Sequence, residues 1–138
     1  MSRLLRWIAP LALLAAIPAA RAHAQGYVVV VNASAGVGSM SKEDLSKVFL
    51  KKSTALAPVD QDKASAVRAA FSKAVLGRPT AAVGAYWQQQ IFAGKDVPPP
   101  EKGSDADVLA FVKGNPKAIG YVAGGAALPD GVKAVTVQ

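Results

Sequence analysis

Four consecutive valines, Val28 to Val31, followed by Asn32, constrain the fold of this chain more than any other feature. The run is apolar at every position, and β-branched residues favour the extended conformation. A strand of this kind has no face suited to water, so both of its faces must be covered. The run therefore predicts a strand that lies inside a sheet, with other elements packed on both sides.

Four helical segments are expected after this strand, each beginning at a residue that can cap a helix. The expected cap residues are Ser41, Ser65, Thr80 and Ser104. In the third helix, three apolar side chains fall on one face and are expected to point inward: Val83, Trp87 and Ile91. Gly114 is expected to follow the last residue of the fourth helix, in the position where glycine commonly ends helices.

Two more apolar runs, residues 118–122 and 132–137, follow the fourth helix and are predicted to be strands. A short extended piece, residues 56–61, lies between the first two helices because Ala57 precedes a proline. Within the predicted strand of residues 118–122, Gly120 allows a helix or ligand to approach closely, and Tyr121 is expected at the rim of a cleft. Strands and helices thus alternate, which is typical of an α/β domain around a small mixed sheet.

The first 24 residues have the organisation of a secretory signal peptide. Arg3 and Arg6 give a positively charged start, residues 7–17 are apolar, and Ala22-His23-Ala24 matches an A-x-A cleavage site. The apolar run is shorter than the roughly 20 residues that a membrane-spanning helix needs. We therefore expect cleavage after Ala24, a single periplasmic domain over residues 25–138, and no membrane span within that domain.

The mature part of the chain lacks the residues on which most catalytic and metal sites depend. The chain has no cysteine, and its one histidine, His23, lies in the predicted signal peptide. Ser-His and Cys-His catalysis and most transition-metal sites are therefore excluded, and we expect no enzyme, no cofactor and no metal. Three of the chain's 16 Lys and Arg residues lie in the peptide, which leaves 13 against nine acidic residues, a net charge of +4. Because these basic residues are scattered, nucleic acid is not an expected partner.

Small polar residues at three predicted turns are candidates for an anion site. Gly38-Ser39 follows the first strand, where backbone amides can approach a ligand. Ser65 begins the second helix, with Arg68 one turn later and Asp60 shortly before it, and Ser104 begins the fourth. A helix N-terminus presents free N–H groups that suit an oxyanion, and Asp60 can accept a hydrogen bond from a protonated phosphate. An ordinary turn or capped helix explains each feature equally well, so only convergence in space would make them one site.

Three stretches of the chain resemble the substrate-binding protein family of phosphate ABC transporters. They are "LSKVFL" (residues 45–50), "AYWQQQIFAGK" (85–95) and "SDADVLAFVKGNPKAIGYV" (104–122). The last, a helix followed by a Pro-Lys-Ala-Ile-Gly-Tyr turn and a strand, is the most specific. The resemblance covers essentially the whole mature chain. It implies a single lobe of the type II periplasmic-binding-protein fold, with a mixed sheet flanked by about four helices.

In two-lobed members of that family, phosphate lies in the cleft between the lobes, held by helix N-termini, Ser and Thr hydroxyls, an Arg and an Asp. The resemblance therefore implies an exported protein that binds phosphate or a similar oxyanion and delivers it to a transporter permease. The alternative is a single-lobe interaction or sensor module of the envelope that does not bind phosphate tightly. Two departures favour this alternative: the chain supplies one lobe, and "DQDKASAVR" (60–68) stands where the large relatives have an Arg followed by Ser-Gly-Thr.

Overall fold

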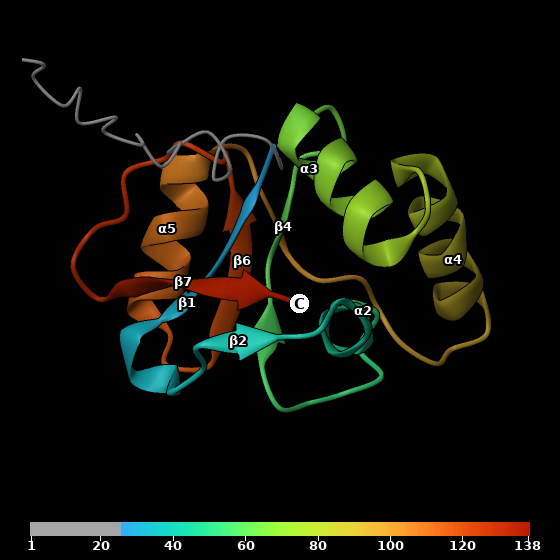
Figure 1. Ribbon diagram of the computed structural model, residues 1–138. Helices are drawn as coiled ribbons and strands as arrows, with labels where there is room; N and C mark the ends of the chain where they lie inside the picture. Colours follow the sequence, from blue (N-terminus) through green and yellow to red (C-terminus); the bar gives the residue numbers. More distant parts are fainter. Residues whose placement is uncertain (1–25) are drawn as a thin grey trace, which may run out of the picture.

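A five-stranded mixed sheet forms the centre of the protein, as Figure 1 shows for the computed structural model, which describes residues 26–138. The predicted signal peptide lies outside the described residues. The sheet has the strand order β2-β7-β1-β6-β3. β1 runs antiparallel to β6 and β7, whereas β2 runs parallel to β7 and β3 parallel to β6. The strands are β1 (Val28–Asn32), β2 (Ser39–Met40), β3 (Ala57–Pro58), β6 (Ala118–Val122) and β7 (Val132–Val137).

Four α-helices accompany this sheet, so the predicted α/β class and mixed sheet are confirmed. Their bounds are α2 (Lys42–Phe49), α3 (Ala66–Phe71), α4 (Thr80–Phe92) and α5 (Asp105–Gly114); α3 continues into the π-helical turn η2 (Ser72–Leu76), and a short 3-10 turn, η1 (Ala33–Ala35), follows β1. Ser41, Ser65 and Ser104 cap α2, α3 and α5 as predicted. In each case the serine Oγ accepts a hydrogen bond from the N–H three residues later, which satisfies one of the free donors of the helix start.

The two faces of the sheet bury two separate apolar clusters, which explains the continuous valine run of β1. Val29 and Val31 pack with residues of α2 and α3, whereas Val30 packs with residues of α5 on the other face. In Figure 1, α5 lies on one side of the sheet, and α2, α3 and α4 lie on the other. β1 is therefore covered on both faces, as its composition predicts.

Helix α5 approaches β6 most closely at Gly120. A Cβ at this position would lie 2.8 Å from Val108 Cγ1 of α5 and 2.8 Å from Val59 Cγ1, closer than a Cβ contact normally allows. The close approach predicted for Gly120 is therefore confirmed, and its neighbour there is a helix. None of the helices in residues 26–138 has the length and hydropathy needed to cross a bilayer.

Two expectations for α4 are wrong. Thr80 is the first residue of the helix, and Pro79 occupies the cap position without a side-chain hydrogen bond. Ile91 is 52% exposed, so only Val83 and Trp87 of the predicted inward face are buried. The reason is tertiary: α4 packs mainly against the turn η2 and not against the sheet, so a narrower stripe of its surface is covered.

The predicted end of α5 is also different. Gly114 is the last helical residue, and the residue after it, Asn115, has an extended conformation with φ −130°. Asn115 precedes Pro116, and steric clash with a proline ring disfavours helical backbone in the preceding residue. The proline, and not a left-handed glycine, therefore ends this helix.

Candidate functional site

The candidate site lies where the chain leaves the edge of the main sheet after β3. One residue later the chain forms a short strand, β4 (Asp60–Gln61), which pairs in parallel with β5 (Glu101–Lys102). α3 begins a few residues after β4, and α5 begins just after β5. This arrangement brings two of the predicted helix starts to one place. We call it the α3–α5 junction, and it consists of Asp60, Gln61, Ser65, Arg68, Glu101, Asp105 and Tyr121.

Gln61 links the two helix starts at the centre of the junction. Its side chain is buried, and its Oε1 accepts a hydrogen bond from Ser65 Oγ at 2.9 Å. Its Nε2 donates to Asp105 Oδ1 at 2.7 Å and to the carbonyl oxygen of Tyr121 at 2.9 Å. All three hydrogen bonds of the Gln61 side-chain amide are made to groups of the protein, so both of its N–H donors are already used.

Arg68 points inward and is only 4% exposed. Its Nη1 donates to the carbonyl oxygen of Gln61 at 2.7 Å and to Glu101 Oε1 at 2.8 Å, and its Nη2 lies 3.9 Å from Asp60 Oδ2. The guanidinium is therefore neutralised by two carboxylates of the same chain. Of the two carboxylates that face Arg68, Glu101 is more accessible to solvent than Asp60, because 38% of the Glu101 side chain is exposed and only 9% of the Asp60 side chain.

Tyr121 completes the network from the sheet side. Its hydroxyl donates to Asp60 Oδ1 and accepts from the Gln61 N–H at 3.2 Å, while its ring stacks on Phe71 at 4.1 Å between centroids. The side chain is fully buried, so the expectation that it reaches a cleft rim is wrong. Buried tyrosine hydroxyls normally find a polar partner, and here that partner is Asp60.

Burial and mutual attraction shift the pKa values of these groups. Burial raises the pKa of Asp60 above its ordinary value, although the charge of Arg68 and the hydrogen bond from Tyr121 oppose this. Burial, followed by the negative charge of Asp60, raises the pKa of the Tyr121 hydroxyl. For Arg68, burial lowers the pKa, but Asp60 and Glu101 outweigh it and the pKa is raised overall, so the guanidinium stays charged.

The structure brings together four of the six residues proposed for anion binding. Asp60, Ser65 and Arg68 lie in the junction, and Ser104 caps the helix whose first residue is Asp105. Gly38-Ser39 lies elsewhere, because β2 and β3 are at opposite edges of the five-stranded sheet. With three strands between them and neighbouring strands about 4.8 Å apart, the two edges are separated by roughly 19 Å.

Gly38 instead lines a separate hollow of about 270 Å³ at the end of β1. Its carbonyl oxygen accepts a hydrogen bond from the Thr136 N–H, which ties this loop to β7. Asn32 and Lys133 contribute the polar side chains of this hollow. The two sets of candidate residues therefore belong to different places on the molecule.

Sequence reasoning missed Gln61, Glu101 and Tyr121 as members of the network. The sequence does indicate a polar partner for Tyr121, because a tyrosine inside a fully apolar strand needs a hydrogen-bond partner for its hydroxyl. It gives no such indication for Glu101, since the contact of Glu101 with Arg68 depends on the pairing of β4 with β5, two strands of two residues each. Within residues 26–138, no group of three or more His, Cys, Asp or Glu side chains is arranged to hold a metal ion.

Comparison with solved structures defines the class of fold. The chain is similar to a protein from Clostridium perfringens described as a phosphate ABC transporter substrate-binding protein with bound phosphate, at 19% identity and a TM-score of 0.61, over 81% of this chain and 44% of that chain. It is also similar to an ABC-type phosphate transport receptor from Vibrio cholerae (19% identity, TM-score 0.58, 81% and 46%). A third similar structure is PstS from Borrelia burgdorferi (12% identity, TM-score 0.60, 82% and 47%).

These matches are structural, and no protein-family model and no curated protein sequence matches this chain. The chain spans less than half the length of the solved structures that it matches. It therefore has the fold of one lobe of a type II binding protein, as the resemblance in sequence implies. The structural neighbours are binding proteins, so the shared fold gives no indication of an enzyme.

Proposed function

We propose that this protein is an exported single-lobe module that acts through a protein partner in the envelope and does not hold phosphate tightly. The observation that carries the proposal is the state of Arg68, which is buried and whose Nη1 is already bound by Glu101 and the carbonyl of Gln61. Its Nε has no hydrogen-bond partner among residues 26–138, but it is buried and not exposed to a ligand in solution. An arginine that recognises phosphate needs free N–H groups aimed at the ligand. The carboxylates of Asp60 and Asp105 add further negative charge close by.

A titration with inorganic phosphate tests this proposal directly. We expect no heat of binding and no change in melting temperature up to about 10 mM phosphate, sulfate or molybdate. Tight binding could not be missed in this assay, because a ligand at 100 times its Kd would add about 2.7 kcal/mol of stability. A melting temperature that rises by several degrees with phosphate would refute the proposal. Co-purification of a defined envelope protein, such as a transporter permease, would support it.

A second candidate function, oxyanion binding at the junction, is favoured by the partial exposure of Glu101. A phosphate that displaces this side chain would inherit its contact with Arg68, while the Glu101 carboxylate would move into water. The variant Glu101→Ala removes the internal competitor, and Glu43→Ala, an exposed glutamate on α2, is the matched control. If the wild type and the control bind phosphate with a Kd below about 1 mM, oxyanion binding becomes the preferred function. If only Glu101→Ala binds, the internal carboxylate is what prevents binding.

Export is the remaining part of the proposal, and it rests on the signal-peptide pattern of residues 1–24. Expression of the full chain in a bacterium should give a periplasmic product whose intact mass corresponds to a chain that begins at Gln25. A product that retains residues 1–24 and stays in the cytoplasm would contradict this expectation.

A further inference from the structure

The outward face of α4 carries an uncharged stripe that is exposed along its whole length. Ala81, Ala85, Gln88 and Phe92 are spaced by four, three and four residues, which places them on one side of the helix, and all four are exposed. The buried residues of the helix, Val83 and Trp87, lie on the opposite side. This 4-3-4 spacing is that of the seam along which two helices pack against each other.

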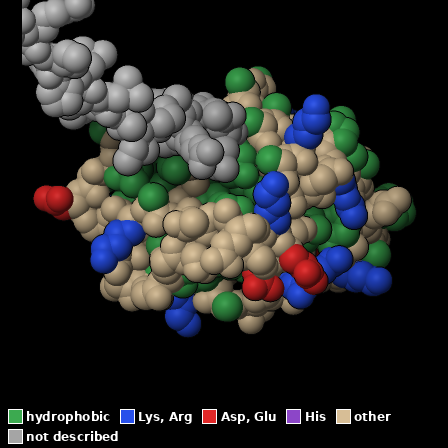
Figure 2. All heavy atoms as spheres, viewed as in Figure 1, with side chains coloured by type: hydrophobic (Ala, Val, Ile, Leu, Met, Phe, Trp, Pro, Cys, Tyr) green, Lys and Arg blue, Asp and Glu red, His purple; other side chains and the backbone are tan. Residues whose placement is uncertain are grey.

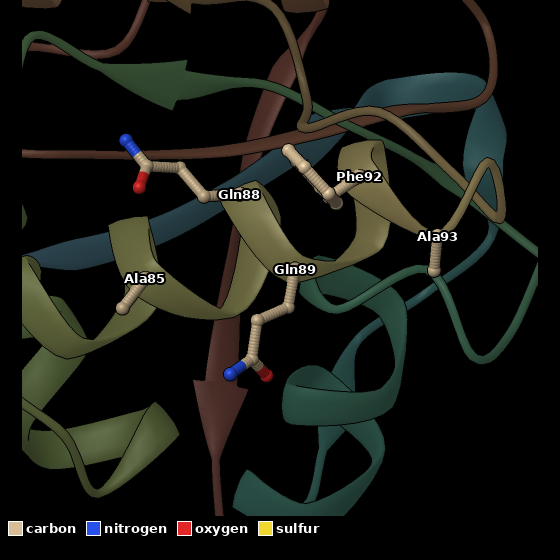
Figure 3. A pocket seen from close by; sticks show the side chains of 5 residues that line it. All are labelled: Ala85, Gln88, Gln89, Phe92 and Ala93. Atoms are coloured by element: carbon tan, nitrogen blue, oxygen red, sulfur yellow. The ribbon is translucent and has the colours of Figure 1, made fainter.

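The C-terminal end of this stripe is strongly apolar. Phe92 is 97% exposed, Ile91 52% and Val97, a few residues further on, 59%. Beside Phe92, a shallow hollow of about 480 Å³ is lined by the helix itself. In Figure 3, the side chains of Ala85 and Gln89 project to one side of the helix axis and those of Gln88 and Phe92 to the other. An aromatic ring this exposed, with two more exposed apolar side chains close to it in the sequence, is typical of an interaction surface.

We infer that α4 is a dimerisation helix, which pairs with the α4 of a second copy of this chain in an antiparallel arrangement. The stripe is complementary to itself: it has small residues, Ala81 and Ala85, at one end and the bulky Phe92 at the other. A two-fold axis between Ala85 and Gln88 sets Phe92 of each copy against Ala81 of the other, so that the large side chain fills the space that the small one leaves. A parallel pairing would place the two Phe92 rings together and leave the alanines without a partner.

The absence of charge from α4 fits this pairing. The helix contains no charged residue, so the contact buries no unpaired charge. The nearest charged residues, Arg78 before the helix and Lys95 and Asp96 after it, lie outside the stripe, and Asp96 is paired with Lys51 of the same chain. A membrane surface is a poorer fit, because helices that lie in the interface carry Lys and Arg along their polar face, and α4 has none. On the face shown in Figure 2, Lys and Arg side chains are scattered and do not gather in one patch.

A single helix pair of 13 residues per copy makes a small interface. Such contacts lie below about 1,200 Å² in total and give weak association. We therefore expect a monomer–dimer equilibrium at concentrations of roughly 10 µM to 1 mM. The inference does not depend on whether the α3–α5 junction binds an anion, because none of the junction residues belongs to α4.

Sedimentation equilibrium of the purified protein over this concentration range tests the dimer. Ala85→Glu places a carboxylate of each copy beside the two-fold axis and is expected to raise the dimer dissociation constant at least about tenfold. The matched control is Ala110→Glu, an exposed alanine on α5 that should leave the dissociation constant unchanged. Circular dichroism checks that both variants are folded. A wild-type protein that stays monomeric at 1 mM, or an equal effect of the two variants, would overturn the inference.

A spin label tests the antiparallel arrangement, and the absence of cysteine from the chain makes specific labelling simple. Ala81→Cys protein carrying a nitroxide is mixed with unlabelled protein enriched in ¹⁵N. We expect the amide signals around Phe92 of the enriched copies to broaden. Broadening centred on Ala81 of the enriched copies, or none on α4, would refute the pairing. Binding of the wild type to anionic phosphatidylglycerol vesicles without self-association would show that a membrane, and not a second copy, covers the stripe.

Discussion

Replacing Gly120 with alanine is the most direct test of how the sheet and α5 pack together. The added methyl group would lie 2.8 Å from Val108 Cγ1 and 2.8 Å from Val59 Cγ1, and 3.5 Å from Val112 Cγ2. The first two distances are well inside normal contact, so at least one of the valines or the helix itself must move. Both valines are completely buried, so neither side chain has free space to turn into.

The size of the effect follows from two opposing contributions. Adding a methyl group to a tightly packed core generally costs about 1–3 kcal/mol. Replacing glycine with alanine also restricts the unfolded chain, which stabilises the protein by about 0.4–1 kcal/mol where the backbone conformation is permitted. Gly120 has no positive φ angle, so this gain applies here. We therefore expect Gly120→Ala to lower the free energy of unfolding by about 1–2 kcal/mol.

Urea unfolding followed by circular dichroism measures this change, with Gly84→Ala as the matched control. Gly84 lies inside α4, and a Cβ there would meet no atom within 4 Å, so alanine should stabilise the protein at that position. The double variant Gly120→Ala/Val108→Ala should be less destabilised than the sum of its single variants, because the shortened side chain makes room for the new methyl group. A Gly120→Ala protein as stable as the wild type would show that the α5–β6 contact is looser than these distances imply.

Three further predictions concern the polar interactions of the described residues. Arg68→Met leaves the carboxylate of Asp60 buried without a cation and should cost about 3 kcal/mol in urea unfolding, the low end for a broken buried pair; a loss below about 1 kcal/mol would contradict the inferred role of the pair. Because burial raises the pKa of Asp60 above its ordinary value, the native protein holds this proton more strongly than the unfolded chain does. The stability of the wild type relative to Asp60→Asn should therefore fall as the pH rises from about 4 towards 7, and an increase over that range would refute the assigned shift. Asn32→Ala removes hydrogen bonds from Nδ2 to the carbonyl oxygens of Val112 (2.9 Å) and Lys113 (3.0 Å) at the end of α5. It should cost about 2 kcal/mol, and faster amide exchange at the end of α5 would locate the loss there.

Local patterns in the sequence were sufficient to predict the four helices and the strands β1, β6 and β7, but not the two-residue strands β2 and β5. The valine run of β1 and the serine caps of α2, α3 and α5 each depend on interactions within a few residues, and all four are confirmed. The third helix was predicted less well, because the buried face of α4 is decided by what it packs against. Its sequence offers apolar residues on several sides, and only the contact with η2 determines that Ile91 stays in water.

The candidate site was harder to predict, because it depends on strand order. The loop at Gly38-Ser39 and the helix start at Ser65 both follow strands and have the same local chemistry. Which of them lies near Ser104 depends on the fact that β2 and β3 occupy opposite edges of the sheet, and no local pattern records this. The partners of Arg68 were hidden for the same reason, since Glu101 is 33 residues away and reaches it only through the pairing of β4 with β5.

The balance of charge at the junction supports the proposal that this protein does not hold phosphate tightly. Two carboxylates, from Asp60 and Glu101, lie against a single guanidinium, and Gln61 links a third, Asp105, to the same junction. A phosphate that displaced Glu101 from Arg68 would still lie close to the carboxylate of Asp60. Two like charges about 4 Å apart repel by about 4 kcal/mol near a protein surface, which is comparable to the whole free energy of a millimolar complex. Tight binding would therefore need more accessible donors than Arg68 offers, because its Nε, which has no partner within the described part of the chain, is buried.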